Sequence, residues 1–235
     1  MAFGRFNQQE TVFTGYEQAR PVAHEGMETR LNFLKKVYSL FFASILFACG
    51  GAYLGMTTLA PAIARNYFLF SILEIGLVFF AMAVRQREGL NLLALFAFTS
   101  LSGALPGPWL AHLAATQPGV VLQTFILTAG VFGGLTVYVF AARKDFSFMG
   151  GFLFVGLLAL IIGGVVNIFI ASSAMHFAMS ACGVLLFAGF ILYDTSNIVL
   201  RYPSNEYVAG ALSLYLDFLN LFLNLLSLLS GGRDE

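Results

Sequence analysis

Long apolar segments recur along this chain at short intervals, and they constrain its fold more than any other feature. They lie near residues 34–56, 67–84, 90–113, 119–141, 149–171, 176–200 and 207–229. As helices, such segments are long enough to cross about 30 Å of hydrocarbon. Because 59% of the residues are hydrophobic and only 10% are charged, lipid is needed to cover the excess apolar surface. The sequence therefore predicts an all-α, polytopic membrane protein with seven transmembrane helices.

The first 30 residues are polar, and we expect them to form a mobile cytoplasmic tail with no cleavable signal peptide. Residues 31–235 are then a single seven-helix transmembrane domain. Their connections are short, and no soluble domain is expected between the spans. The third apolar segment is interrupted by Pro106, Gly107 and Pro108.

Lysine and arginine indicate how the bundle is oriented. Of the 12 such residues, all but Arg65 and Arg233 fall on one side if the spans alternate. Positive residues concentrate on the cytoplasmic side of membrane proteins. We therefore expect a cell (inner) membrane protein with its N-terminus in the cytoplasm and its C-terminus outside. The ten residues on the cytoplasmic side would be Arg5, Arg20, Arg30, Lys35, Lys36, Arg85, Arg87, Arg143, Lys144 and Arg201.

Composition also argues against several functions. The net charge of zero gives no electrostatic basis for binding nucleic acid. Cys49 and Cys182 have no motif spacing and are expected to act as small packed hydrophobes. The last apolar segment contains no lysine, which excludes a retinal Schiff base. We expect no cofactor.

Three acidic residues lie at membrane depth, where a charge is costly unless it is paired or hydrated. They are Glu74, Asp194 and Asp217. Arg85, near the end of the second apolar segment, is their expected basic partner from another helix. For Glu74, which lies between Leu73 and Ile75, functional and structural roles are both open.

The last apolar segment carries a polar stripe with spacings of 4, 3, 4 and 3, so one helical face is polar through much of the bilayer. This predicts a helix in the centre of the bundle. Its amides could simply hold helices together, whereas an aspartate is a costly way to do so. The stripe consists of Ser213, Asp217, Asn220, Asn224 and Ser227.

Asp194 shares a helical face with Asn197 and Arg201. A local ion pair with Arg201 is one role for it; pairing with Arg85 is another. The short turn at 202–205 would place the sixth and seventh spans side by side, with Asp194 and Asp217 at similar depth. Two adjacent carboxylates in a low-dielectric site cannot both ionise easily. The pair would therefore respond to physiological pH and, when doubly ionised, attract a cation.

Small residues at helix-packing spacing suggest close approach between helices. They are Gly130, Gly134, Gly156, Gly163 and Gly164. His112 and His176 are expected near the outer surface as interface residues.

Two stretches carry a specific family resemblance. Residues 188–194 read AGFILYD and residues 211–222 read ALSLYLDFLNLF. Supporting matches are Leu73–Glu74 with Arg85 eleven residues beyond the acid, the KDFSF loop at 144–148 and the NIF triplet at 167–169. From about residue 30 to 230 the chain resembles the Bax inhibitor (transmembrane Bax inhibitor motif) family, and its short tail and loops resemble bacterial members.

The resemblance implies a seven-helix fold with the last helix in the centre. It also implies a calcium leak channel gated by pH through a di-aspartyl unit, which falls on Asp194 and Asp217. Arg85 matches a basic latch that pairs with the first aspartate in the closed state. Glu74 matches an acidic position of the ion path, to which we add Asn220 and Asn224. The two aspartates would bind calcium only transiently, since calcium prefers six to eight oxygens.

Two other functions are alternatives for this chain. An intramembrane aspartyl protease would need a Gly-x-Gly-Asp sequence, but Leu214, Tyr215 and Leu216 precede Asp217. We therefore expect no enzyme. A regulator that binds a membrane protease or other membrane proteins remains the alternative, with the polar tail as its handle. The expected partners are the lipid bilayer and calcium, and the expected state is a monomer.

Overall fold

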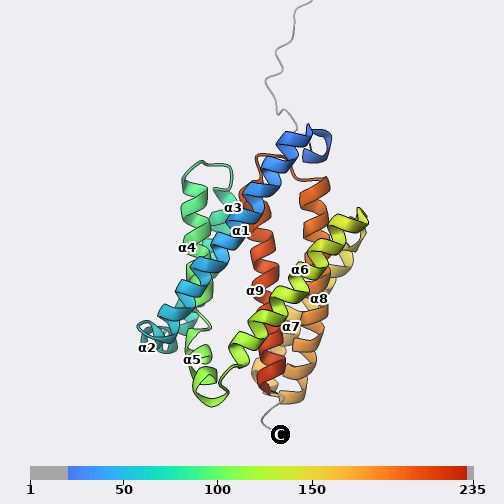
Figure 1. The fold of residues 1–235 in the computed structure, drawn as a ribbon. Coiled ribbons are helices and arrows are strands. Elements are labelled where there is room, and N and C mark those ends of the chain that lie inside the picture. Colours follow the sequence, from blue (N-terminus) through green and yellow to red (C-terminus); the bar gives the residue numbers. More distant parts are fainter. Residues whose placement is uncertain (1–20, 232–235) are drawn as a thin grey trace, which may run out of the picture.

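The computed structural model describes residues 21–231, which are helical apart from short connections (Figure 1). The α helices are α1 (Met27–Met56), α2 (Ala60–Arg65), α3 (Tyr67–Ala83), α4 (Leu90–Ala104), α5 (Gly107–Thr116), α6 (Val120–Ala142), α7 (Gly150–Ile170), α8 (Ser173–Leu200) and α9 (Tyr207–Gly231). Two single-turn 3-10 helices, η1 (Val22–His24) and η2 (Ser147–Met149), precede α1 and α7. The all-α, polytopic prediction is confirmed.

The count of seven spans is not confirmed by helix length. Five helices, α1, α6, α7, α8 and α9, are long and apolar enough to cross a membrane. The pair α4 and α5, bent by 41°, adds a sixth if it forms one span. The remaining apolar helix, α3, has 17 residues, or about 26 Å at 1.5 Å per residue. It is at the short end of what a bilayer requires.

The bend between α4 and α5 lies at the interruption noted in the sequence. Pro106 is the residue before α5, and Pro108 is in its first turn. A proline nitrogen cannot donate to the preceding turn, so α4 cannot continue as one straight helix. Proline in the first turn of α5 costs no hydrogen bond there.

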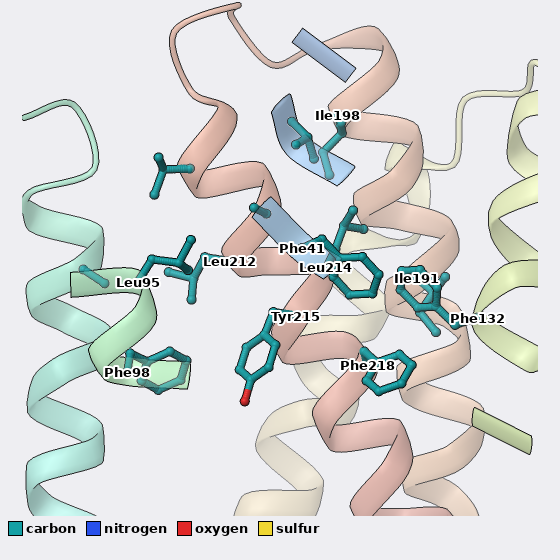
Figure 2. Packing of buried hydrophobic residues seen from close by; sticks show 14 of the residues in the cluster. Phe41, Leu95, Phe98, Phe132, Ile191, Ile198, Leu212, Leu214, Tyr215 and Phe218 are labelled. Carbon is teal, nitrogen blue, oxygen red and sulfur yellow. The ribbon is translucent and has the colours of Figure 1, made fainter. Parts of the chain in front are cut away.

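Helix α9 is the centre of the bundle, as predicted. It packs against α8, α1, α6 and α4, whereas α3 packs mainly on α4 and α7 mainly on α8. The Phe218 ring lies among those of Phe41, Phe125 and Phe132, with centroids 5.7–5.9 Å apart. Figure 2 shows Phe218 and Tyr215 on α9 between aromatic side chains of its neighbours. The side chains at this centre come from segments far apart in the sequence.

Helix α1 and the α4–α5 pair approach each other closely at several glycines. A Cβ added to Gly103 would overlap the backbone of Ala48, and one added to Gly51 would overlap the carbonyl of Ser100. Gly55 lies equally close to Ala104. These glycines let two helix backbones touch, which is how small residues act in membrane bundles.

The glycines that were predicted from the sequence to allow close helix packing lie in looser contacts. A Cβ on Gly130 or Gly134 would meet nothing within 4 Å, so close packing there was a wrong prediction. Gly156 faces the end of the Leu186 side chain, and Gly163 and Gly164 face Met179. Flexible side chains can move aside, so these positions are less constrained than the α1–α4 contact.

The segment before α1 is tied to the turn between α8 and α9. The Val22 N–H donates to the Tyr202 carbonyl at 2.8 Å, and the Ser204 hydroxyl donates to Glu25 at 2.9 Å. Helix α1 then begins at Met27, inside the range predicted as tail. The first 20 residues of that tail lie outside the described range.

Candidate functional site

Asp194 and Asp217 are brought together by the α8–α9 pair. The turn between these helices makes them antiparallel neighbours, and the two carboxyl groups lie within hydrogen-bonding distance of each other. A hydrogen bond between two carboxyl groups needs a proton on one of them, because two carboxylates offer only acceptors. The predicted adjacency of the two aspartates is therefore present in the fold.

The environment of Asp217 is nearly dry. The residue is 4% exposed, and its Oδ2 has no hydrogen-bond partner among residues 21–231. Leaving a buried polar atom without a partner costs about 1–3 kcal/mol. A proton, a water molecule or a cation at this oxygen would remove that cost.

Arg85 lies in an ion pair that the sequence analysis did not foresee. Its Nε donates to Glu206 at 2.8 Å, and the Gln86 amide donates to the other Glu206 oxygen at 2.6 Å. These bonds connect the α3–α4 loop to the turn before α9. In this structure Arg85 pairs with Glu206, and its predicted pairing with Asp194 stays a prediction.

We expect a Glu206→Gln substitution to weaken the ion pair only modestly. The side chains of Arg85 and Glu206 are 40% and 12% exposed, and an ion pair that reaches solvent contributes less than about 1 kcal/mol. Thermal unfolding in detergent should show a small loss that shrinks at high salt. Glu88→Gln, at an exposed site in the α3–α4 loop that carries Arg85, is the matched control. Equal losses in both variants would contradict a specific role for Glu206.

Arg201 does not pair with Asp194. It donates to Asp145 at 2.7 Å and to the Ser147 hydroxyl at 2.6 Å, which ties the end of α8 to the α6–α7 connection. A hydrogen bond from the Ser147 backbone N–H, together with the Arg201 guanidinium, lowers the pKa of Asp145 from 3.8 to about 2. The stability that this pair adds is fully present above the ordinary aspartate pKa of 3.8, and it is lost as the pH falls through about 2. It is constant across physiological pH.

A cavity of about 810 Å³ opens at the other end of the bundle, where α9 ends. It lies between α3, the α4–α5 bend, α8 and α9, and its lining includes Glu74, Asn224 and His176. Glu74 forms no ion pair with any other residue between 21 and 231. When it is ionised, an acidic side chain without such a partner attracts cations to this cavity.

The polar stripe of α9 divides into two kinds of contact. The amide groups of Asn220 and Asn224 donate to α9 carbonyls one turn earlier, at 2.8 Å each, so these donors do not join helices. Ser227 does reach another helix. Its hydroxyl lies 2.8 Å from both the Ser180 hydroxyl and His176 Nε2 of α8. His176, expected only at an interface, therefore belongs to the cavity wall.

Tyr215 connects α9 to α4 at the cavity wall. Its hydroxyl is hydrogen bonded to Ser102, which lines the cavity, at 2.6 Å, and lies 3.3 Å from the Thr99 carbonyl. The ring is 1% exposed and lies two residues before Asp217. The sequence analysis missed this contact because Ser102 and Tyr215 show no spacing that relates them.

Comparison with known proteins gives a family match over nearly the whole described chain. A family model described as "Inhibitor of apoptosis-promoting Bax1" matches residues 30–234. An uncharacterized protein of Campylobacter jejuni is 41% identical over 209 residues, covering 86% of this chain and 90% of that protein. Protein lifeguard 4 of Mus musculus is 37% identical over 219 residues, 91% of each chain. Bax inhibitor 1 of Schizosaccharomyces pombe is 32% identical over 243 residues, 97% and 88% of the two chains.

Proposed function

This chain belongs to the Bax inhibitor family of membrane proteins, and on that premise we propose that it is a pH-sensitive cation leak that passes calcium. The observation that carries the proposal is the contact between half-buried Asp194 and buried Asp217. A carboxyl pair at membrane depth is an expensive way to hold two helices together. It is a suitable way to couple a helix contact to protonation.

Protonation changes the charge of this pair in single steps. With one proton the carboxyl groups share a hydrogen bond, and with none they repel each other and attract a cation. The phenol of Tyr202 lies near these groups, and the charges of Asp194, Asp217 and Glu206 all act on it. A second proton leaves the pair without the negative charge that attracts Arg85. We propose that this loss of charge weakens the closed bundle, so that flux rises as pH falls.

The cavity provides the approach for ions in this proposal. Glu74 attracts cations into it, and Asn224 lies on its wall. The Tyr215–Ser102 hydrogen bond joins α9 to α4 at the cavity wall, which supports a closed arrangement. Calcium reaching the pair would find two carboxyl groups, fewer oxygens than the six to eight it prefers. Water would complete its shell, and such weak binding suits passage.

The experiment is calcium flux into liposomes that contain the purified protein, measured between about pH 5 and pH 8. Protein-free liposomes and liposomes with sodium or potassium in place of calcium are run in parallel. We expect protein-dependent calcium entry that grows as pH falls. Entry equal to that of protein-free liposomes at every pH would contradict the proposal.

The orientation is also proposed. The N-terminal end of the bundle, which carries the α3–α4, α6–α7 and α8–α9 connections, would face the cytoplasm of a cell with an inner membrane. The excess of positive residues in those connections supports this. Cysteine labelling from each side of intact cells, at Glu88→Cys and at Thr116→Cys, should report opposite accessibility.

A regulator that binds a membrane protease or other membrane proteins is the second candidate. A relative that carries the name Bax inhibitor 1 favours it, since that name describes an effect on another protein. Removing residues 1–20 should then abolish co-purification of a membrane partner while calcium flux persists. Retained co-purification would contradict the tail as its handle.

A further inference from the structure

A crevice of about 600 Å³ opens at the N-terminal end of the bundle, between α1 on one side and α6 and α8 on the other. Its walls are apolar along most of their length. They are formed by Leu31, Leu34, Val139, Phe140, Val199 and Leu200. In a chain that spans a membrane, an apolar crevice between helices is filled by lipid chains, because water gains no hydrogen bonds there.

The rim of this crevice is basic. Arg30 from the first turn of α1, Arg143 from the end of α6 and the adjacent Lys144 all line it. None of the three forms an ion pair with another residue in the range 21–231. The nearby acid Asp145 is already engaged by Arg201 and Ser147. Three positive charges therefore line one opening, and none of them is in an ion pair with an acid within residues 21–231.

The first turn of α1 adds hydrogen-bond donors to the same place. Met27 and Arg30 line the crevice, and the residue before the helix, Gly26, has no side chain to cap the free N–H groups. A helix N-terminus and basic side chains that converge on one point form an anion site together. Neither the helix N-terminus nor the basic side chains would specify a ligand alone. The apolar walls beneath them favour an anion that carries an acyl chain.

We propose that this crevice binds an anionic phospholipid, with the phosphate held by Arg30, Arg143 and Lys144 and an acyl chain between α1 and α8. Basic pockets between transmembrane helices are typical sites for anionic headgroups. Arginine suits a phosphate because its planar group donates two parallel hydrogen bonds. The bound lipid would connect α1 to α6 and α8, the helices that pack around α9.

The test uses the full chain in neutral detergent. Native mass spectrometry counts the lipids that are retained, and thermal unfolding reports stabilisation. The probes are a phosphatidylglycerol, a phosphatidylcholine with the same acyl chains, and inorganic phosphate. We expect retention of the phosphatidylglycerol alone. In an Arg30→Gln, Arg143→Gln double variant its affinity should fall about 25-fold, at about fivefold for each basic residue lost.

Two matched variants make the result specific. Lys35→Gln with Arg87→Gln removes the same charge from exposed positions outside the crevice and should retain the lipid as wild type does. Arg30→Lys with Arg143→Lys keeps the charge and should retain most of the affinity even if the Gln variant folds poorly. Equal losses in the first control, equal retention of phosphatidylcholine, or equal stabilisation by inorganic phosphate would each overturn the proposal.

Discussion

An Asp217→Asn variant is expected to give calcium flux that hardly changes with pH, where wild-type flux rises in acid. Asparagine has nearly the same shape as aspartate, and its amide can still donate to Asp194, so the α8–α9 contact should survive. The variant cannot gain or lose a proton at this position. Flux in liposomes across about pH 5 to pH 8 measures the effect.

The same profile is expected for Asp194→Asn and for the double variant, because two groups that share one proton act as a unit. Asp145→Asn is the control. Hydrogen bonds from Ser147 and Arg201 lower the pKa of Asp145 to about 2, so it is already charged throughout the measured range. Its removal should leave the pH profile in place. Wild-type profiles in both single variants of the pair would show that the dyad model is wrong.

A Gly103→Ala variant is expected to lose most of its folded population. The added methyl group would occupy the space of the Ala48 backbone, and backbone in a helix cannot turn away as a side chain can. Helices α1 and α4 would have to separate along their shared contact, which also contains Gly51 and Gly55. We expect a loss of at least about 4 kcal/mol, which is exceptional for one methyl group.

Thermal unfolding and the fraction of monodisperse protein in detergent measure this loss. Gly130→Ala is the control, because a Cβ there would meet nothing within 4 Å. It makes the same chemical change in the middle of another membrane helix and should leave both quantities near wild type. A Gly103→Ala protein as stable as Gly130→Ala would contradict the close approach of α1 and α4.

The positions of the helices could be predicted closely because hydrophobic length is a local property of the sequence. The predicted segment at 67–84 is α3 at Tyr67–Ala83, and the one at 119–141 is α6 at Val120–Ala142. The two prolines also marked the place where α4 ends. What length could not settle is whether α3, with 17 residues, crosses the bilayer.

The pairing of Asp194 with Asp217 was predictable because a short turn forces neighbouring helices together. The partner of Arg85 was not. Glu206 lies in a connection, outside the membrane segments in which acidic residues attract notice, and its distance from Arg85 depends on how α3 and α4 pack. A salt bridge between two loops leaves no periodic trace in a sequence.

The glycines show the same limit from another side. Gly130 and Gly134 have the spacing of a packing motif, as does the pair Gly51 and Gly55. Only the second pair has a helix backbone against it. The spacing of glycines shows that a helix has a smooth face. Whether another helix packs on that face depends on the arrangement of the whole bundle.

The bonds of Val22 and Glu25 to the α8–α9 turn have a mechanical consequence. Residues 21–25 form a short segment that is hydrogen bonded to the turn between the two helices that carry the aspartates. A pull on the N-terminus would act directly on that turn, before any force reached α1 along its length. A pull on the C-terminus would instead act first on α9, which carries Asp217 itself.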